Sequence, residues 1–400
     1  MIQSKVRISA VVLLAAVLSF LSAVMVGGTT GVKKSRLKTY QSKYYVIHTD
    51  MDIETVREVH ARLTAMAEEY HHRTRGFAGK IRRKLPFYLF SRKEDYYAAG
   101  GLPGSAGCFI YQGYNRGKLM VVAGKRRSDS VWHTMQHEGW HQFVHMVIRG
   151  HIPIWVNEGL AEYFGCGIWT GDGLVTGVIP PNRLRRVKEL IKTGKILPFP
   201  KMLEMTRRQW NTKLSGRNYD QAWSMCHFLV HADGGKYRDA FGAFIKDVSR
   251  NRPRRQAFVA RFGGNVKAFQ QRYENWWLSL SDDPTADVRT LAVVQTLTSY
   301  LARAKVMKLK FDNVEDFFTA AKEGKISPDP RRYPDLWLPR SLLDKVMQQA
   351  QRLKVWSLQS KTNSIVLKLP DGSTFCGKFM LRTPARPKVW VIHQPARKKR

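Results

Sequence analysis

The spacing of apolar side chains predicts strands first and helices later in the first 280 residues. Residues 43–50 and 84–92 are rich in β-branched and aromatic residues, which favours strands, and residues 52–73 have the period of an amphipathic helix. Residues 106–124 predict two further short strands joined by a glycine-containing turn. We therefore expect a small mixed sheet with a helix packed against it.

From residue 129 the apolar period becomes that of helices. Six segments share this period: 129–149, 155–164, 183–193, 219–232, 236–249 and 265–280. The order of elements, a small sheet followed by helices, predicts an α+β domain that covers residues 40–280.

A polar stretch with a proline, residues 279–288, predicts the end of this domain. Beyond it, helical patterns occur near residues 287–304 and 341–354, and strand patterns occur within residues 364–381. Residues 285–400 are therefore expected to form a small α+β appendage. They carry no recognisable chemical motif, so the sequence indicates no role for them.

The first thirty residues have the layout of an export signal. Lys5 and Arg7 precede an apolar run over residues 8–28. A run of about twenty apolar residues is also long enough to span a bilayer as an uncleaved anchor. Both interpretations place the rest of the chain outside the cytoplasm, as a secreted, periplasmic or membrane-anchored protein. The alternative is a buried helix at the N-terminus of the fold.

The chain is strongly basic, with 67 Lys and Arg against 31 Asp and Glu and a formal net charge of +36. Such a surface attracts anionic cell-surface polymers or acidic lipids. The basic residues are dispersed, and no nucleic-acid-binding module accompanies them, so no specific nucleic-acid partner is expected. The four cysteines are too few for a disulfide scaffold and match no zinc-ribbon spacing.

Histidines recur at every fourth position from His133 to His145. Each step of four residues rotates about 40° around a helix, so only neighbouring rungs of this ladder can meet one ion. Glu138 follows His137 and completes the sequence His-Glu-Gly-Trp-His, in which His137 and His141 bind zinc and Glu138 acts as general base. We expect His133 and His145 to be flanking residues with packing or hydrogen-bonding roles, and His151 to be a loop residue.

A third metal ligand is available in the segment WVNEGLAEYF, residues 155–164. A turn with Pro153 ends the first helix, so a second helix can return across it and bring Glu158 to the metal. Three protein ligands with one open position are typical of catalytic zinc. Glu162 lies one turn further on and is a candidate acceptor for a ligand imidazole N–H; the alternative is a solvated glutamate.

These two motifs resemble those of the gluzincin metallopeptidases, in particular the exported peptidase MA-like families. The resemblance rests on HEGWH and on W-x-N-E-G-x-A-E-Y, and extends loosely over residues 40–280. It implies a zincin-like helical subdomain with the third zinc ligand at Glu158. It also implies an oxyanion-binding tyrosine on a later helix, for which Tyr219 is the candidate, and a substrate-pairing edge strand at residues 117–124.

The sequence therefore predicts an exported peptidase with one Zn²⁺ per chain and a peptide or protein substrate. No aminopeptidase-type G-A-M-E-N motif precedes HEGWH, which favours an endopeptidase. Two alternatives remain at this point. One is a catalytically inactive basic surface protein that binds anionic polymers, and the other is a zinc-free structural protein with an accidental motif.

Overall fold

The computed structural model describes residues 37–111, 113, 117–124, 128–148, 150–212, 216–353, 355–359, 364–381 and 386–396. The predicted export segment, residues 1–30, lies outside these ranges. Among the described residues, no helix has both the length and the apolar character that crossing a membrane requires.

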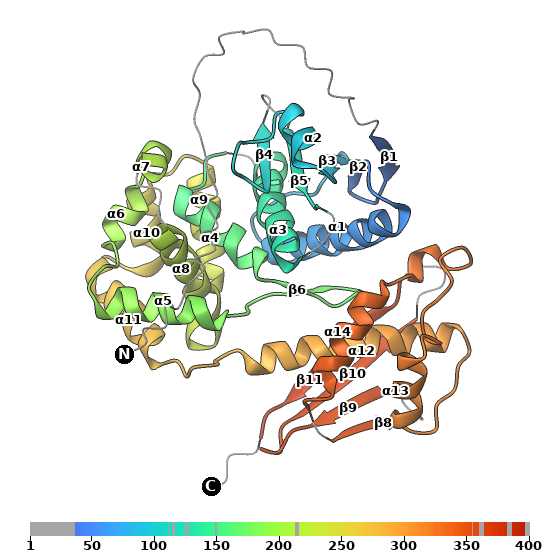
Figure 1. Cartoon of the computed structure of the whole chain (residues 1–400). Coiled ribbons are helices and arrows are strands. Elements are labelled where there is room, and N and C mark those ends of the chain that lie inside the picture. Colours follow the sequence, from blue (N-terminus) through green and yellow to red (C-terminus); the bar gives the residue numbers. More distant parts are fainter. Residues whose placement is uncertain are drawn as a thin grey trace, which may run out of the picture.

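The N-terminal part is a mixed sheet with helices on both faces (Figure 1). Its strands have the order β1 (Lys38–Gln41), β2 (Tyr45–Thr49), β3 (Leu85–Phe90), β5 (Gly117–Val122) and β4 (Gly107–Tyr111). The three inner strands are parallel, and each outer strand is antiparallel to its neighbour.

Alternate residues of these strands form two separate apolar clusters. Leu119 and Val121 face the core shared with α1 (Ile53–Thr74) and α3 (Asp129–Phe143). Met120 and Val122 face the short helix α2 (Lys93–Ala98) through Tyr96. The sheet is thus buried on both faces, as expected where strands run in parallel.

The expectation that residues 117–124 form the edge strand is wrong. β5 pairs with β3 on one side and with β4 on the other, so the outer strand next to β5 is β4. Strand order depends on how the chain crosses between strands, and the apolar pattern of a single strand does not carry that information.

The helical region follows α3 and a π-helical turn at Val144–Ile148, which ends the helix predicted for residues 129–149. Its elements are α4 (Ile154–Gly165), the β6–β7 hairpin (Ile168–Trp169, Leu174–Val175), α5 (Pro181–Lys192), α6 (Phe199–Glu204), α7 (Arg207–Thr212), α8 (Gly216–Gly235), α9 (Arg238–Ser249), α10 (Arg254–Phe262) and α11 (Val266–Ser279). The pattern of apolar residues did not predict α6, α7 and α10.

Helices α4 and α8 pack very closely, and one glycine makes this possible. A Cβ atom at Gly159 would lie 2.3 Å from the carbonyl oxygen of Ala222 and 2.6 Å from Sγ of Cys226. Any larger residue in place of Gly159 would push the two helices apart. Gly159 therefore sets the distance between Glu158 on α4 and the side chains of α8.

Residues 286–396, called here the C-terminal unit, contain the predicted helices and strands. α12 (Ala286–Val306) packs on an antiparallel sheet of β11 (Lys388–Gln394), β10 (Thr374–Met380), β9 (Ser364–Lys368) and β8 (Trp356–Gln359). α13 (Val314–Lys322), the 3₁₀ turn Pro334–Leu336 and α14 (Arg340–Ala350) complete it. The α+β class predicted from the sequence is confirmed.

The C-terminal unit shares its apolar core with the rest of the molecule. Its buried cluster includes Ala61 of α1 and Trp169 of the β6–β7 hairpin, which lies between the two parts in Figure 1. Arg303 of α12 is fully buried and makes two bonds to the carboxylate of Asp172, at 2.7 and 2.9 Å. Removing one partner of such a buried pair typically costs about 3–5 kcal/mol, so these contacts attach the unit firmly.

Candidate metal centre

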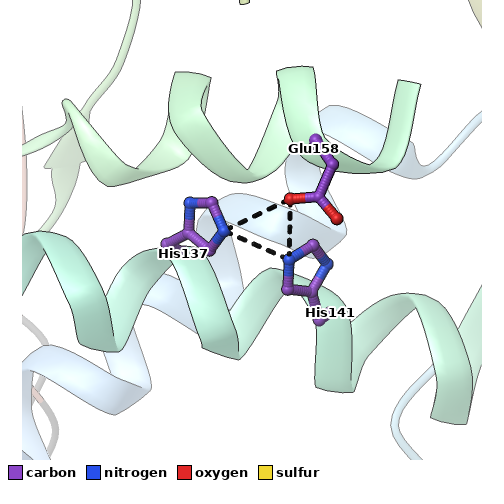
Figure 2. Close-up of side chains that lie close together, drawn as sticks. All are labelled: His137, His141 and Glu158. Atoms are coloured by element: carbon purple, nitrogen blue, oxygen red, sulfur yellow. Dashed lines mark hydrogen bonds and ion pairs between the residues drawn. The ribbon is translucent and has the colours of Figure 1, made fainter. Parts of the chain in front are cut away.

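Three predicted ligand side chains from two helices converge on one point. His137 and His141 project from α3, and Glu158 projects toward them from α4 (Figure 2). The Nε2 atoms of the two histidines lie 3.2 Å apart. Oε2 of Glu158 lies 3.6 Å from Nε2 of His137 and 3.4 Å from Nε2 of His141. These atoms form the metal-compatible group found among the described residues.

This triangle has the dimensions of three corners of a metal-centred tetrahedron. Zinc–nitrogen and zinc–oxygen bonds of about 2.0–2.1 Å place tetrahedral ligand atoms about 3.3–3.4 Å apart. The three observed separations, 3.2, 3.4 and 3.6 Å, bracket that value. The residues therefore fit a divalent ion with two nitrogen donors and one oxygen donor, and a fourth corner is left for water or substrate.

Local contacts explain why α3 and α4 hold this geometry. The side-chain amide of Gln136 on α3 donates to the carbonyl groups of Phe164 and Gly165 at the end of α4. The hydroxyl of Tyr70 on α1 donates to the carbonyl of Gln136. Gly139 lies where α3 faces α1, and a Cβ atom there would be 2.6 Å from Cε of Met66. The two helices that carry the candidate ligands are thus fixed to each other and to the sheet domain.

Glu162 lies in the predicted position behind the ligand histidine. Its Oε1 is 3.1 Å from Nδ1 of His137, so it accepts the second imidazole N–H and fixes the ring. Burial would raise the pKa of Glu162, but the charge of Arg183 and the bonds from His133 and His137 hold it well below its usual range. Glu162 is therefore an ionised acceptor.

An arginine–aspartate network that was not predicted from the sequence supports Glu162. Arg183 on α5 binds the carboxylate of Glu162, and its Nε lies 3.0 Å from Oδ1 of Asp220 on α8. Arg186 binds the same aspartate at 2.6 Å. The one available signal was the position of Asp220 directly after Tyr219. The pairing with α5 arises only from the packing of helices in space.

Glu138, the predicted general base, does not belong to the metal-compatible group. Its Oε2 accepts a hydrogen bond of 2.9 Å from the backbone N–H of Phe109 on β4. The carboxylate is half-buried and lies between the metal-binding helix and the outer strand of the sheet. A substrate backbone lying along β4 would therefore pass beside Glu138.

Tyr219 lies close to the candidate metal ligands. Its ring centroid is 6.5 Å from that of His137, and the ring packs edge-on against Trp210 at 5.1 Å. Burial raises the pKa of Tyr219, and the nearby carboxylates of Glu158, Glu162 and Glu138 raise it further. The phenol therefore stays protonated and is available as a hydrogen-bond donor.

The three other histidines of this segment lie outside the triangle. His133 has Nε2 3.4 Å from Oε2 of Glu162; burial lowers its pKa, but bonds to Cys166 and Glu162 raise it to about 9. His145 lies 3.3 Å from the carbonyl of Gly113, and His151 is exposed in a loop. Their positions agree with the flanking roles expected from the sequence.

Residues 132–255 match a family described as "Protein of unknown function (DUF1570)". The matched segment contains the three candidate ligands, Glu138, Glu162 and Tyr219, and it covers neither the N-terminal sheet nor the C-terminal unit. A search of curated proteins finds no match to the chain.

Proposed function

We propose that the protein is a zinc-dependent peptidase that hydrolyses internal peptide bonds. The observation that carries this proposal is the triangle formed by His137, His141 and Glu158, with edges of 3.2–3.6 Å and a potential base, Glu138, beside it. Two histidines and one carboxylate are typical of catalytic zinc, whereas structural zinc usually has four protein ligands with cysteine among them. One ion per chain follows from the one triangle found in the described part of the chain.

A bound Zn²⁺ ion would polarise the scissile carbonyl group and make a water molecule acidic enough to react near neutral pH. Glu138 would accept the proton of that water and transfer it to the leaving amine. Tyr219 would donate a hydrogen bond to the oxygen on which negative charge develops. Glu162 would keep the His137 ring oriented.

The outer strand β4 is the part of the sheet that fits an extended substrate. The N–H of Phe109 on this strand already donates to Glu138, so a chain paired with β4 would bring its carbonyl groups close to that carboxylate. This assignment replaces β5, which both neighbouring strands cover. We further propose, from the layout of residues 1–30, that hydrolysis takes place outside the cytoplasm.

The second candidate function is a basic surface protein that binds anionic polymers or acidic lipids, and the net charge of +36 favours it. It predicts retention on heparin that weakens as salt shortens the Debye length below about 10 Å. Binding alone, however, requires neither an ionised Glu162 behind His137 nor a carboxylate at position 138. The peptidase therefore accounts for more of the site.

Metal analysis combined with a peptide-library digest tests the proposal. The parent protein should hold one zinc ion per chain and cleave library peptides. Glu138→Gln should keep the zinc and lose at least ~10²-fold in kcat/KM, because Glu138 handles a proton without binding the metal. Glu189→Gln, an exposed site on α5, is the matched control and should change neither property.

Undiminished cleavage by Glu138→Gln would exclude the proposed role of Glu138. A parent protein that binds zinc and heparin but cleaves no peptide would favour the binding protein.

A further inference from the structure

A large cavity lies between the metal centre and the C-terminal unit. Its volume is about 1790 Å³, which exceeds the roughly 300–1,000 Å³ of sites for small molecules. We propose that this cavity binds an acidic segment of a polypeptide substrate adjacent to the scissile bond, so that the C-terminal unit forms one wall of the substrate site. The proposal rests on the peptidase function stated above.

One wall of the cavity belongs to the metal centre. It includes His133, Glu162 and Tyr219, and Glu162 binds the imidazole of the ligand His137. Of the groups proposed to contact the reacting atoms, Tyr219 lines the cavity, so a chain whose carbonyl oxygen accepts from Tyr219 can continue into it.

The opposite wall consists of α12 and α14 of the C-terminal unit. Val293 and Thr296 of α12 line it, together with Ser341 and Gln349 of α14 and Arg352 just beyond α14. The wall is fixed in place, since Arg303 anchors α12 to Asp172. Lys345 of α14 also binds Asp129, the first residue of the metal-binding helix α3, at 2.9 and 3.0 Å.

The charges that face the open space of the cavity are mainly basic. Two of the acidic lining residues, Glu162 and Asp220, have side chains that are 9% and 5% exposed and lie under arginines. Asp129, a third acidic lining residue, is 85% exposed and pairs with Lys345, which is 55% exposed. Arg186 is 52% exposed and Arg352 is exposed, so basic side chains outnumber the acidic one on the exposed part of the lining. A ligand in the cavity therefore meets cationic groups, which favour carboxylate side chains.

Apolar side chains lie between these charges and favour a polypeptide over a carbohydrate or nucleic-acid polyanion. Peptide side chains can cover apolar surface and pair with arginine in the same segment, whereas a uniformly charged polymer leaves apolar surface uncovered. The apolar lining residues are Trp132, Trp169, Val293, Leu342, Val346 and Leu353.

Peptide binding to the full-length, zinc-loaded Glu138→Gln protein tests the proposal without turnover. The probes are two pools of labelled random peptides, each about twelve residues long, with fixed acidic or fixed basic residues at alternate positions. Gln349→Trp fills the cavity and Arg352→Glu reverses a charge in it. Gln348→Trp, at the preceding residue of α14 and outside the cavity lining, is the matched control.

The acidic pool should bind the Glu138→Gln protein about tenfold more tightly than the basic pool. Gln349→Trp and Arg352→Glu, each added to that protein, should weaken binding of the acidic pool about tenfold, and the added Gln348→Trp should have no effect. Equal binding of the acidic pool by all three added variants would overturn the proposal. So would a protein that binds no peptide but binds heparin, if Gln349→Trp and Arg352→Glu abolish the heparin binding.

Hydrolysis measured in proteins that retain Glu138 separates this proposal from the peptidase function. Acidic peptides that bind through the cavity but are not cleaved would reject the peptidase and leave the cavity assignment intact. Cleavage of long acidic peptides at the parent rate by both Gln349→Trp and Arg352→Glu would reject the cavity assignment and leave the peptidase intact.

Discussion

Two pairs of histidines in this protein have the same helical spacing and opposite properties. His137 and His141 lie four residues apart on α3, and His227 and His231 lie four residues apart on α8. The ring centroids are 4.9 Å apart in the first pair and 4.5 Å apart in the second. Spacing alone therefore does not distinguish a metal site from a packed pair.

The neighbours of each pair make the difference. Burial would lower the pKa of His137, but bonds to Glu158 and Glu162 raise it well above its usual value. Burial lowers the pKa of His227 to about 4 and that of His231 to about 2, and no carboxylate offsets it.

The bonding partners of the α8 pair agree with this contrast. His227 Nε2 lies 3.1 Å from the carbonyl oxygen of Gly177, and His231 Nε2 lies 2.9 Å from the hydroxyl of Tyr163. A cation is favoured only where carboxylates from a second helix face the pair, as Glu158 and Glu162 do on α4.

Removing the carboxylate that faces the α3 pair should produce the largest effect. Glu158→Ala should lower zinc affinity by more than the roughly 100-fold expected for an outer residue, and should abolish hydrolysis with it, because a direct ligand is lost. Zinc content measured after dialysis, together with peptide cleavage, checks this.

The second histidine pair supplies the control for this prediction. His231→Gln should keep one zinc ion per chain, as should His133→Ala and His145→Ala. Loss of zinc from His231→Gln, or retention of zinc by Glu158→Ala, would contradict the distinction drawn between the two pairs.

The sequence predicted the group of His137, His141 and Glu158 because its members are close together along the chain. His137, Glu138 and His141 lie within two turns of one helix, so helical geometry constrains their relative positions. Glu158 follows on the next helix, after a single reversal of the chain. Strands β2 to β5 and the longer helices of residues 40–280 were also predicted, since each has its own apolar period, whereas β1 and the β6–β7 hairpin were not.

Features that depend on long-range packing could not be predicted in this way. Arg183 and Asp220 meet only because α5 packs beside α8, and Arg303 binds Asp172, 131 residues earlier in the chain. The edge position of β4 likewise depends on strand order. The cavity behind Glu162 exists only once the C-terminal unit is docked, so no role for that unit could be predicted from the sequence.

Helix α8 carries the neutral histidine pair and also, near its first turn, Tyr219. The proposed role of Tyr219 as a hydrogen-bond donor can be tested separately. Tyr219→Phe should lower kcat by roughly 10- to 10³-fold while zinc content stays at the parent level, because the change removes one donor to the developing oxyanion. Steady-state kinetics with metal analysis checks this. A lower zinc content in Tyr219→Phe would indicate that the tyrosine supports the ligands instead.

Glu162 tests the comparison of the two histidine pairs directly. A carboxylate lies behind the ring of His137, whereas none lies behind the ring of His227. Glu162→Gln should lower zinc affinity by roughly 10- to 100-fold, since a neutral amide orients and polarises the His137 ring less well. Competition with a chelator measures this, and circular dichroism checks that the variant is folded. An unchanged affinity would mean that packing alone orients the ring.

The α8 pair should affect the pH dependence of stability and leave the chemistry of the site unchanged. The pKa of His227 is about 4 in the folded protein against 6.5 without burial. Between these pH values the unfolded chain binds a proton that the folded protein excludes, so stability falls as pH falls through this window. The loss at about pH 5 should reach about 2 kcal/mol.

His227→Gln keeps a donor for the Gly177 carbonyl but does not titrate, so it removes this contribution and retains the bond. Urea unfolding of both proteins at about pH 7 and about pH 5 should therefore show a smaller loss of stability in the variant, with equal zinc content at the higher pH. Groups at the metal site are common to both proteins, so their contribution cancels in the difference. Identical pH dependence in the two proteins would show that His227 is accessible to protons, and would remove the electrostatic contrast between the two histidine pairs.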